Sequence, residues 1–357
     1  MEILIVFVPI TVVAILFIFL ARARNPGPLT PGKHDQLYAG VAPGVIPARP
    51  DEAPTRPTTA EDRTVPIAVR FEPPQGVLPH QVGMLAQAKV DSGDIAACLV
   101  GLTVARWISI TQLEARPGFF GRTRKPEWQL AVVTPPPPGL VGWLGEEIVM
   151  LLLQHGPSTL DDLKPALRQA IPAWRARLAA EPVHRTWYPR LSLAGTPGAL
   201  GTGVRQRSAL GAALRYQLAG FKQFLETADG DRLRFEEGAG IFSRYLPWAI
   251  ALGVTTQWVA ALREAAAGLS AADAAVWSTD LAWYGDFGLG GIDLGGLDGI
   301  GDALGDFSAA MDSFADGIGD LTDSISGDIS DSGGGGDSGG GDGGGGGGDG
   351  GGGGGGD

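Results

Sequence analysis

The stretch DIAACLVGLTVARWISITQLE (94–114) changes its apolar period half-way along. Up to Trp107, the apolar residues Ile95, Leu99 and Leu102 recur at the spacing of one helix face. From residue 107 to residue 114, apolar and polar residues alternate as they do in a half-buried strand. The stretch therefore predicts a helix over 94–107, with an N-cap in the turn before it, that leads into a strand.

The neighbouring segments extend this pair of elements on both sides. PHQVGMLAQA (79–88) opens with proline and has helical spacing, whereas WQLAVV (128–133) has the pattern of a returning strand. Helix, turn, helix and a two-stranded ribbon form the outline of a winged helix, which we place over residues 70–134. The end of the second helix and the basic tip of the ribbon supply the candidate contacts to nucleic acid or to a partner: Arg106, Arg116, Arg122, Arg124 and Lys125.

This outline is compatible with two functions. In a DNA-binding regulator, the helix 94–107 would enter a major groove while the basic tip contacted phosphates. That helix is small and apolar, however: Arg106 is its only basic residue, and it has no Asn or Gln to read base edges. We therefore favour a module that binds other proteins, with a membrane-tethered DNA-binding transcriptional regulator as the alternative.

A second winged-helix-like unit is predicted over residues 140–190. Residues 140–154 have the spacing of a helix, Ser158–Asp161 supplies the cap of a second helix, and residues 171–187 form a third. The run IVMLLL (148–153) is flanked by polar and charged residues and is too short to cross a bilayer, so we assign it to the core.

A helical subdomain is predicted over residues 204–268. The segment SALGAALRYQLAGFKQFLETA (208–228) is an amphipathic helix, and one of its faces carries Leu210, Leu214, Leu218, Phe221 and Leu225.

The segment SRYLPWAIALGVTTQWV (243–259) is apolar, but its uncharged run covers less than half of a membrane crossing. We expect Pro247 to open a short helix there, Gly253 to close it and Thr255 to cap the next. This arrangement would place Trp258 against Tyr245 or Trp248.

The N-terminus carries a segment predicted to cross a membrane. Residues 3–20 are apolar almost throughout, and their helical length of about 27 Å just covers a hydrocarbon core. Arg22, Arg24 and Lys33 follow the span, so the positive-inside rule places the N-terminus outside and the body in the cytoplasm. A cleaved signal peptide is the competing interpretation, but the basic n-region of such a peptide is missing. We assign residues 1–24 to a transmembrane anchor.

Low-complexity regions flank the predicted folded units. Residues 25–69 are rich in Pro, Thr and Ala without an apolar period, so we expect a tether that spans roughly 35 Å as a flexible coil. Residues 269–330 are acidic and low in complexity, and their apolar residues predict an amphipathic segment that binds a partner groove or stays disordered. Residues 331–357 contain Gly, Asp and two Ser, and we expect this tail to be disordered.

Composition narrows the possible chemistry. All 27 Lys and Arg precede residue 264, whereas 17 Asp follow it, so the net charge of −12 comes from the C-terminal region and the rest is mildly basic. The single cysteine, Cys98, allows no intramolecular disulfide, and the four scattered His form no metal-binding pattern. No nucleophile-elbow motif is present. We therefore expect no enzymatic activity, no cofactor and no bound metal.

Four stretches resemble a known family: FEPPQGVLPHQVGML (71–85), DIAACLVGLTVARWISI (94–110), GFKQFLETADGDRL (220–233) and IFSRYLPWAIALGVTTQWV (241–259). Together with the glycine-rich C-terminus, they are similar to the C-terminal cytoplasmic part of the YciQ-like predicted membrane proteins, domain-of-unknown-function family 2207. The resemblance implies a bacterial membrane protein whose cytoplasmic part contains winged-helix-like units. It implies no reaction.

These inferences combine into one expected architecture, mainly α with small β-wings. A single N-terminal transmembrane helix contacts the lipid bilayer of the bacterial plasma membrane through residues 3–20. Tandem winged-helix-like units and a helical subdomain follow in the cytoplasm. We expect this protein to bind protein partners as a membrane-anchored scaffold, with nucleic acid as the less favoured partner.

Overall fold

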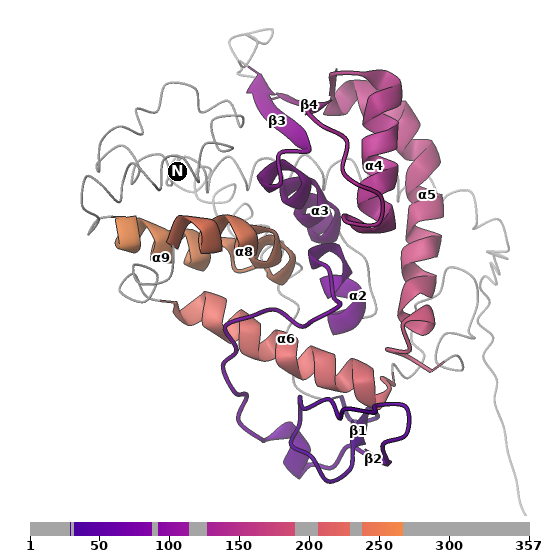
Figure 1. Cartoon of the computed structure of the whole chain (residues 1–357), viewed down its shortest axis with the longest axis vertical. Coiled ribbons are helices and arrows are strands. Elements are labelled where there is room, and N and C mark those ends of the chain that lie inside the picture. The colour runs from indigo at the N-terminus through magenta and orange to yellow at the C-terminus, as the bar shows by residue number, and fades with distance from the viewer. Residues whose placement is uncertain are drawn as a thin grey trace, which may run out of the picture.

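The computed structural model of the chain describes residue 29 and residues 32–87, 92–113, 127–189, 206–228 and 238–266. Most of the regular structure is helical, and two small antiparallel sheets accompany it, which confirms the predicted mainly α class (Figure 1). In chain order the elements are β1 (Gln36–Tyr38), β2 (Thr55–Pro57), the 3-10 helices η1 (Glu61–Arg63) and η2 (Pro79–Gln81), α2 (Val82–Gln87), α3 (Ser92–Val104), β3 (Ile108–Leu113), β4 (Glu127–Val132), α4 (Gly142–His155), β5 (Ser158–Thr159), α5 (Leu160–His184), α6 (Ala209–Thr227), α8 (Gly238–Leu252) and α9 (Thr255–Ala266).

Helix α3 lies at the centre of the described body. It packs against α8, η2, α4 and β3, and residues 94–100 are all buried (Figure 1). The helix ends at Val104, before the predicted Trp107, because Arg106 adopts a left-handed conformation with φ of 57°. The N–H of Trp107 donates to the Leu102 carbonyl and that of Arg106 to the Thr103 carbonyl, which are the hydrogen bonds of a Schellman turn. This turn leads the chain into β3.

The predicted ribbon is present as β3 and β4. The two strands pair antiparallel, with Ile108 opposite Val132 and Leu113 opposite Glu127. A third strand, β5, pairs with β4 and places Ser158 opposite Leu130. Because β5 follows α4 in the chain, the two segments that we predicted as successive winged-helix-like units contribute strands to one sheet.

Helix α5 corrects the prediction of two helices between residues 158 and 187. The predicted cap is confirmed, because the Thr159 hydroxyl accepts from the Asp162 N–H at 3.1 Å. The helix then continues to His184 although it contains Pro165, Pro172 and Pro182. One face of α5 is buried, and it carries Leu163, Ile171, Trp174 and Leu178. The burial of these side chains offsets the free energy that the three prolines cost the helix.

Helix α6 has the predicted apolar face, and Ser208 caps its first turn. The Gly211 N–H donates to the Ser208 hydroxyl at 3.0 Å, and Leu214, Leu218, Phe221 and Leu225 are buried. Aromatic rings from α8 and α9 pack on this face, with ring centroids 4.9 Å apart for Phe221–Tyr245 and 5.8 Å apart for Phe221–Trp248. Two segments that are distant in the sequence thus share one aromatic cluster.

The turn between α8 and α9 agrees with the sequence except for the roles of Pro247 and Thr255. Thr255 is the first residue of α9 and not its cap, because the Val254 carbonyl already accepts from the Trp258 N–H at 3.0 Å. Gly253 ends α8 with φ of 68°, and the Trp258 ring lies 6.2 Å from that of Tyr245, both as predicted. Pro247, however, lies inside α8, which begins at Gly238. The burial of Leu246 and Trp248 on either side of the proline supports the longer helix.

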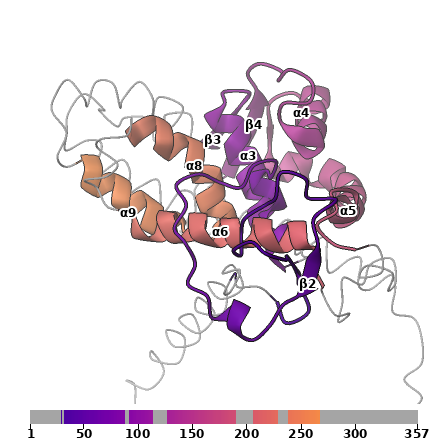
Figure 2. The same ribbon diagram turned by 60° about the horizontal axis from the view of Figure 1, so that its bottom comes forward.

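The Pro-rich segment corrects the prediction of a free tether. Residues 32–72, which we call the strap, run along α6 (Figure 2). The Gln217 side chain donates to the Gly44 carbonyl at 2.7 Å, and the Tyr216 hydroxyl donates to the Pro66 carbonyl at 2.5 Å. The Arg70 N–H donates to the Gly220 carbonyl at 3.2 Å. These contacts bury Tyr216 and Gln217 on the side of α6 away from the aromatic cluster.

A buried ion pair attaches the start of the strap to the body. The Arg207 guanidinium lies 3.3 Å from the Asp35 carboxylate, and the Arg207 backbone N–H donates to the same carboxylate at 3.0 Å. Arg207 also donates to the carbonyls of Leu85 and Ala86 at the end of α2. Arg215, whose pKa burial lowers to about 10, donates to the Ala86 carbonyl as well. Cationic groups thus cap α2 and hold the strap at one point.

Several predicted segments lie outside the described residues. They are the membrane span 3–20, the ribbon tip, the acidic segment 269–330 and the tail 331–357. Within the part of the chain that the structure describes, no helix combines the length and the hydropathy of a membrane crossing.

Candidate interaction surface

The predicted contact residues are only partly placed by the structure. Arg106 is exposed at the Schellman turn between α3 and β3. The four residues predicted at the ribbon tip lie outside the described residues: Arg116, Arg122, Arg124 and Lys125. The structure therefore does not bring the five together into a described site.

The helix that was predicted to enter a DNA groove has no described face with which to do so. Its central residues 94–100 are buried, and α8 covers one side of the helix while η2, α4 and β3 cover others. Asp94, its acidic residue, accepts from the Gly83 N–H at 2.9 Å. A recognition helix needs an exposed polar face that reaches base edges, and the described residues of α3 provide none.

The outer face of α4 exposes large apolar side chains instead. Met150 is 55 % exposed and Leu153 is 48 % exposed, and the two lie one turn apart on the helix. Between them in the sequence, Leu152 is buried and Leu151 is half-buried. The assignment of residues 148–153 to the core is therefore wrong for Met150 and Leu153. Six consecutive apolar residues exceed what one buried side of a helix accommodates.

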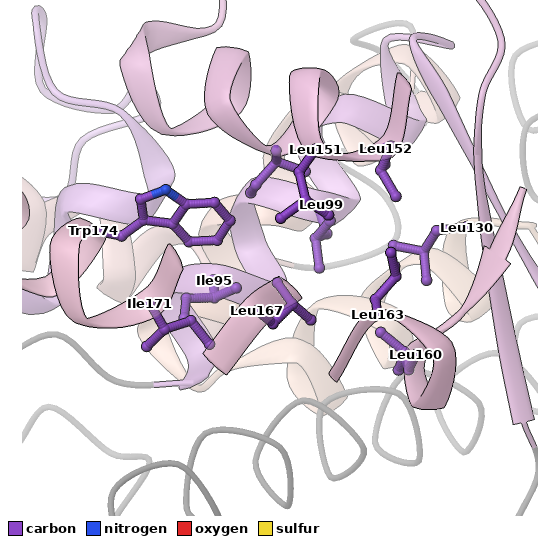
Figure 3. A pocket seen from close by; sticks show the side chains of 11 residues that line it. Ile95, Leu99, Leu130, Leu151, Leu152, Leu160, Leu163, Leu167, Ile171 and Trp174 are labelled. Carbon is purple, nitrogen blue, oxygen red and sulfur yellow. The ribbon is translucent and has the colours of Figure 1, made fainter. Parts of the chain in front are cut away.

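A narrow apolar cavity lies beneath the neighbouring edge of α4. Its lining side chains come from α3, β4, α4 and α5 (Figure 3). They are Ile95, Leu99, Leu130, Ile148, Leu151, Leu152, Leu160, Leu163, Leu167, Ile171 and Trp174. The cavity has a volume of about 30 Å³. Because ligand pockets need roughly 300 Å³ or more, the enclosed space is a gap in packing and not a ligand site.

The rim of this cavity lies on the side of α4 that faces α5, about a quarter-turn of the helix from Met150. Leu151 of α4 and Leu167 of α5 are both half-buried, and both line the cavity. Met150 is next to Leu151 in the helix. We call these four residues, Met150, Leu151, Leu153 and Leu167, the α4 surface. An apolar group that inserts between α4 and α5 at this rim would cover side chains that water now contacts.

A polar junction fixes α4 against α5. The Glu181 carboxylate accepts from Gln81 Nε2 at 2.6 Å, from Trp143 Nε1 at 3.1 Å and from Arg185 Nε at 2.8 Å. The Arg177 guanidinium lies 4.3 Å from the centroid of the Trp143 ring. These contacts hold the first turn of α4 to the last turns of α5, so the α4 surface is presented on a fixed frame.

His80 is buried beside this junction without a partner for one nitrogen. It is 2 % exposed, its Nε2 makes no hydrogen bond, and its ring packs near Gly142 at the start of α4. Burial lowers the pKa of His80 to about 4, with Glu181 opposing the shift and Arg185 adding to it. The imidazole is therefore neutral at pH 7. Among the described residues, no group of His, Cys, Asp and Glu is arranged to hold a metal ion.

The aromatic cluster of α6, α8 and α9 lies in the part of the chain that is similar to a known family. Residues 193–262 match the family described as "Predicted membrane protein (DUF2207) C-terminal domain". Residues 193–262 are therefore similar to the DUF2207 C-terminal domain. The predicted resemblance is thereby confirmed over these residues, and the DUF2207 family is one of predicted membrane proteins. No curated protein and no solved structure gives a significant match to the chain.

The sequence interpretation missed two features of the structure. The first is the α4 surface, for which the six-residue apolar run was an available signal. The second is the ion pair of Asp35 and Arg207, whose partners are 172 residues apart and belong to no periodic pattern. No signal in the sequence identified that pair.

Proposed function

We propose that this protein is a membrane-tethered module that binds another protein through the α4 surface. The observation that carries the proposal is the exposure of Met150 and Leu153 beside the half-buried Leu151 and Leu167. Unbranched, polarizable Met side chains adapt to the shape of a partner, and clustered apolar side chains on a rigid frame are typical of protein contacts.

The tether is supported by the sequence and by the family. Residues 3–20 have the length and hydropathy of a span, and Arg22 and Arg24 follow them. The DUF2207 family is described as one of predicted membrane proteins. We therefore propose a single-pass anchor in the bacterial plasma membrane with the N-terminus outside and the body in the cytoplasm. We propose no catalytic activity for the body.

DNA binding receives no support from α3, since the described residues of that helix are mainly buried. The affinity of the purified full-length protein for duplex DNA, measured over a series of salt concentrations, tests whether the ribbon tip binds DNA. We expect no binding to duplex DNA at low salt. Suppose instead that DNA binds with a steeply salt-dependent affinity, and that the triple variant Arg122→Ala, Arg124→Ala and Lys125→Ala loses it. The protein would then be a DNA-binding regulator, and the protein-binding proposal would be wrong.

Site-specific photo-crosslinking in native membranes tests the protein-binding proposal. A photoreactive amino acid at Leu153 should give a discrete adduct, and the additional substitution Met150→Asp should abolish it by placing a charge in the apolar contact. Val133, which is also exposed, is the matched control position and should give no such adduct. Identical adducts from positions 133 and 153, or an adduct that Met150→Asp does not change, would contradict the proposal.

A further inference from the structure

The attachment of the strap shortens the connection between the body and the predicted membrane span. Asp35 is buried, the Gly32 N–H donates to its carboxylate at 2.7 Å, and Leu29 is buried in the core. Only nine residue steps separate Leu29 from Leu20, where the predicted span ends, and these reach at most about 30 Å. A free tether over residues 25–69 would reach about 150 Å when extended. The strap side of the body is therefore confined close to the bilayer.

The outer edge of the strap is rich in exposed apolar side chains. Val65, Val69 and Phe71 are 37 %, 41 % and 50 % exposed. With Val45, they make four of the eight large apolar residues that are exposed in the described chain, so the strap carries a disproportionate share. The backbone beneath them is fixed on α6 by the hydrogen bonds of Pro66 and Arg70. Phe71 also makes an edge contact with Phe224, with ring centroids 5.3 Å apart.

The charges along this edge nearly cancel. Arg63 and Arg70 are exposed, and so are Glu61 and Glu72. Attraction to anionic headgroups is therefore weak, and the contribution of this edge to binding is the insertion of apolar side chains. Three partly exposed side chains bury far less than the roughly 800 Å² per partner that a stable dimer needs, which disfavours a second copy of the chain as the occupant.

We propose that the edge formed by residues 63–72 rests on the lipid surface, with Val65, Val69 and Phe71 inserted at the boundary of headgroups and acyl chains. This inference rests on the membrane tether of the proposed function, but not on the α4 surface. The short connection makes the docking intramolecular, so a weak affinity of three side chains for the interface is sufficient. Helix α4 lies at the opposite end of the body from β1 and β2 in both views (Figures 1 and 2), so docking of the strap leaves that helix free for a partner.

Lipid-borne quenching of a fluorescent probe tests the docking. The full-length variant Val69→Cys, labelled with an environment-sensitive maleimide dye, is reconstituted at one chain per phosphatidylcholine nanodisc. The native Cys98 stays unlabelled, because it is buried and burial raises its thiol pKa to about 12. Spin-labelled phosphatidylcholine should quench the dye at position 69 at least about twofold more than a dye at Met150→Cys. The substitution Val65→Asp should reduce the difference.

Each other outcome overturns the inference in a recognisable way. If the chain incorporates and the dye is quenched equally at positions 69 and 150, the strap does not dock on the lipid. The proposals of the membrane tether and of the α4 surface are unaffected by that result. A spectral change at position 69 that needs two chains per disc identifies a second copy as the occupant. If the chain does not incorporate into nanodiscs, residues 3–20 do not anchor it in a membrane. The proposed tether is then wrong, and so is the docking that depends on it.

Discussion

The two sides of α6 are covered in different ways. On one side, Phe221 meets Tyr245 and Trp248 of α8, and Trp258 of α9 completes an aromatic cluster. On the other side lies the strap, which has little regular structure and is held by side-chain bonds to its backbone. The first contact is apolar and depends on buried area. The second adds hydrogen bonds, which depend on the positions of individual donors and acceptors, to a small apolar cluster of Tyr38 with Ala209 and Ala213.

This difference predicts different failures. Loss of an aromatic ring removes buried area from the cluster that joins three helices, so it lowers the stability of the whole body. Loss of one strap contact releases a peripheral segment, so it lowers the free energy of a local opening and leaves the rest folded. Substitutions on each side of α6 therefore separate global from local stability.

The largest expected effect is on the aromatic side. Trp258 is fully buried, and its ring stacks on Phe242 at 6.1 Å. Trp258→Ala should lower the free energy of unfolding by about 4 kcal/mol, because it removes a large ring and leaves a cavity. Urea unfolding followed by circular dichroism measures this change, with Trp258→Phe as the milder control. A loss below about 1 kcal/mol would mean that the cluster contributes little to the body.

The next effect is on the strap. Asp35→Ala leaves Arg207 buried without its carboxylate, which costs about 3 kcal/mol and favours release of the strap. We expect limited proteolysis between residues 39 and 66 to accelerate strongly, while the main unfolding transition moves less than in Trp258→Ala. Arg49→Ala, which breaks the exposed pair with Glu52, is the matched control and should change neither. Equal shifts of both measurements would mean that strap and body unfold together.

A pH effect should act on the body through His80. Its pKa is near 4 in the folded protein and near 6.5 in the unfolded chain, so the unfolded state binds more protons between these values. The stability due to neutral His80 is complete above pH 6.5 and falls by up to about 3 kcal/mol as the pH drops to 4. Urea unfolding at pH 7 and pH 4.5 measures this loss. His80→Gln should flatten the dependence, and an unchanged slope in that variant would refute the assignment.

Substitution of Gly220 by alanine should change the free energy of unfolding by a smaller amount, and the sign of that change tests the position of the strap. A Cβ at this position would collide with the Ala68 carbonyl oxygen of the strap. In an otherwise helical context, Gly→Ala stabilises by about 1 kcal/mol. We expect Gly220→Ala to destabilise by about 1 kcal/mol instead, with faster proteolysis of the strap. Stabilisation in a thermal melt would show that the strap does not lie against α6 in solution.

The smallest effect should come from the α4 surface, away from both sides of α6. Met150→Asp replaces an exposed side chain and should change the free energy of unfolding by no more than about 0.5 kcal/mol. Chemical denaturation compares it with the wild type, and Leu152→Asp, at a buried neighbour, is the destabilising counterpart. A large loss in Met150→Asp would show that the residue packs against the body and is unavailable to a partner.

The elements that the sequence predicted correctly are those with a local apolar period. The face of α6, the strands 108–113 and 127–132 and the turn at Gly253 all follow from spacing over a few residues. Prediction of the candidate site was poorer. The ribbon tip was chosen for its charge and lies outside the described residues, whereas Met150 and Leu153 were assigned to the core.

By itself, the sequence determined the helical class, the aromatic face of α6 and the DUF2207 resemblance, because each depends on the order and spacing of neighbouring residues. Only the tertiary structure decided that α5 is continuous through its prolines, that β5 joins the sheet and that Met150 faces solvent. It also decided the course of the strap, since the contact of Asp35 with Arg207 joins residues 172 apart. Such contacts depend on which surfaces the packed helices bring together. The spacing of neighbouring residues in the sequence does not predict those surfaces.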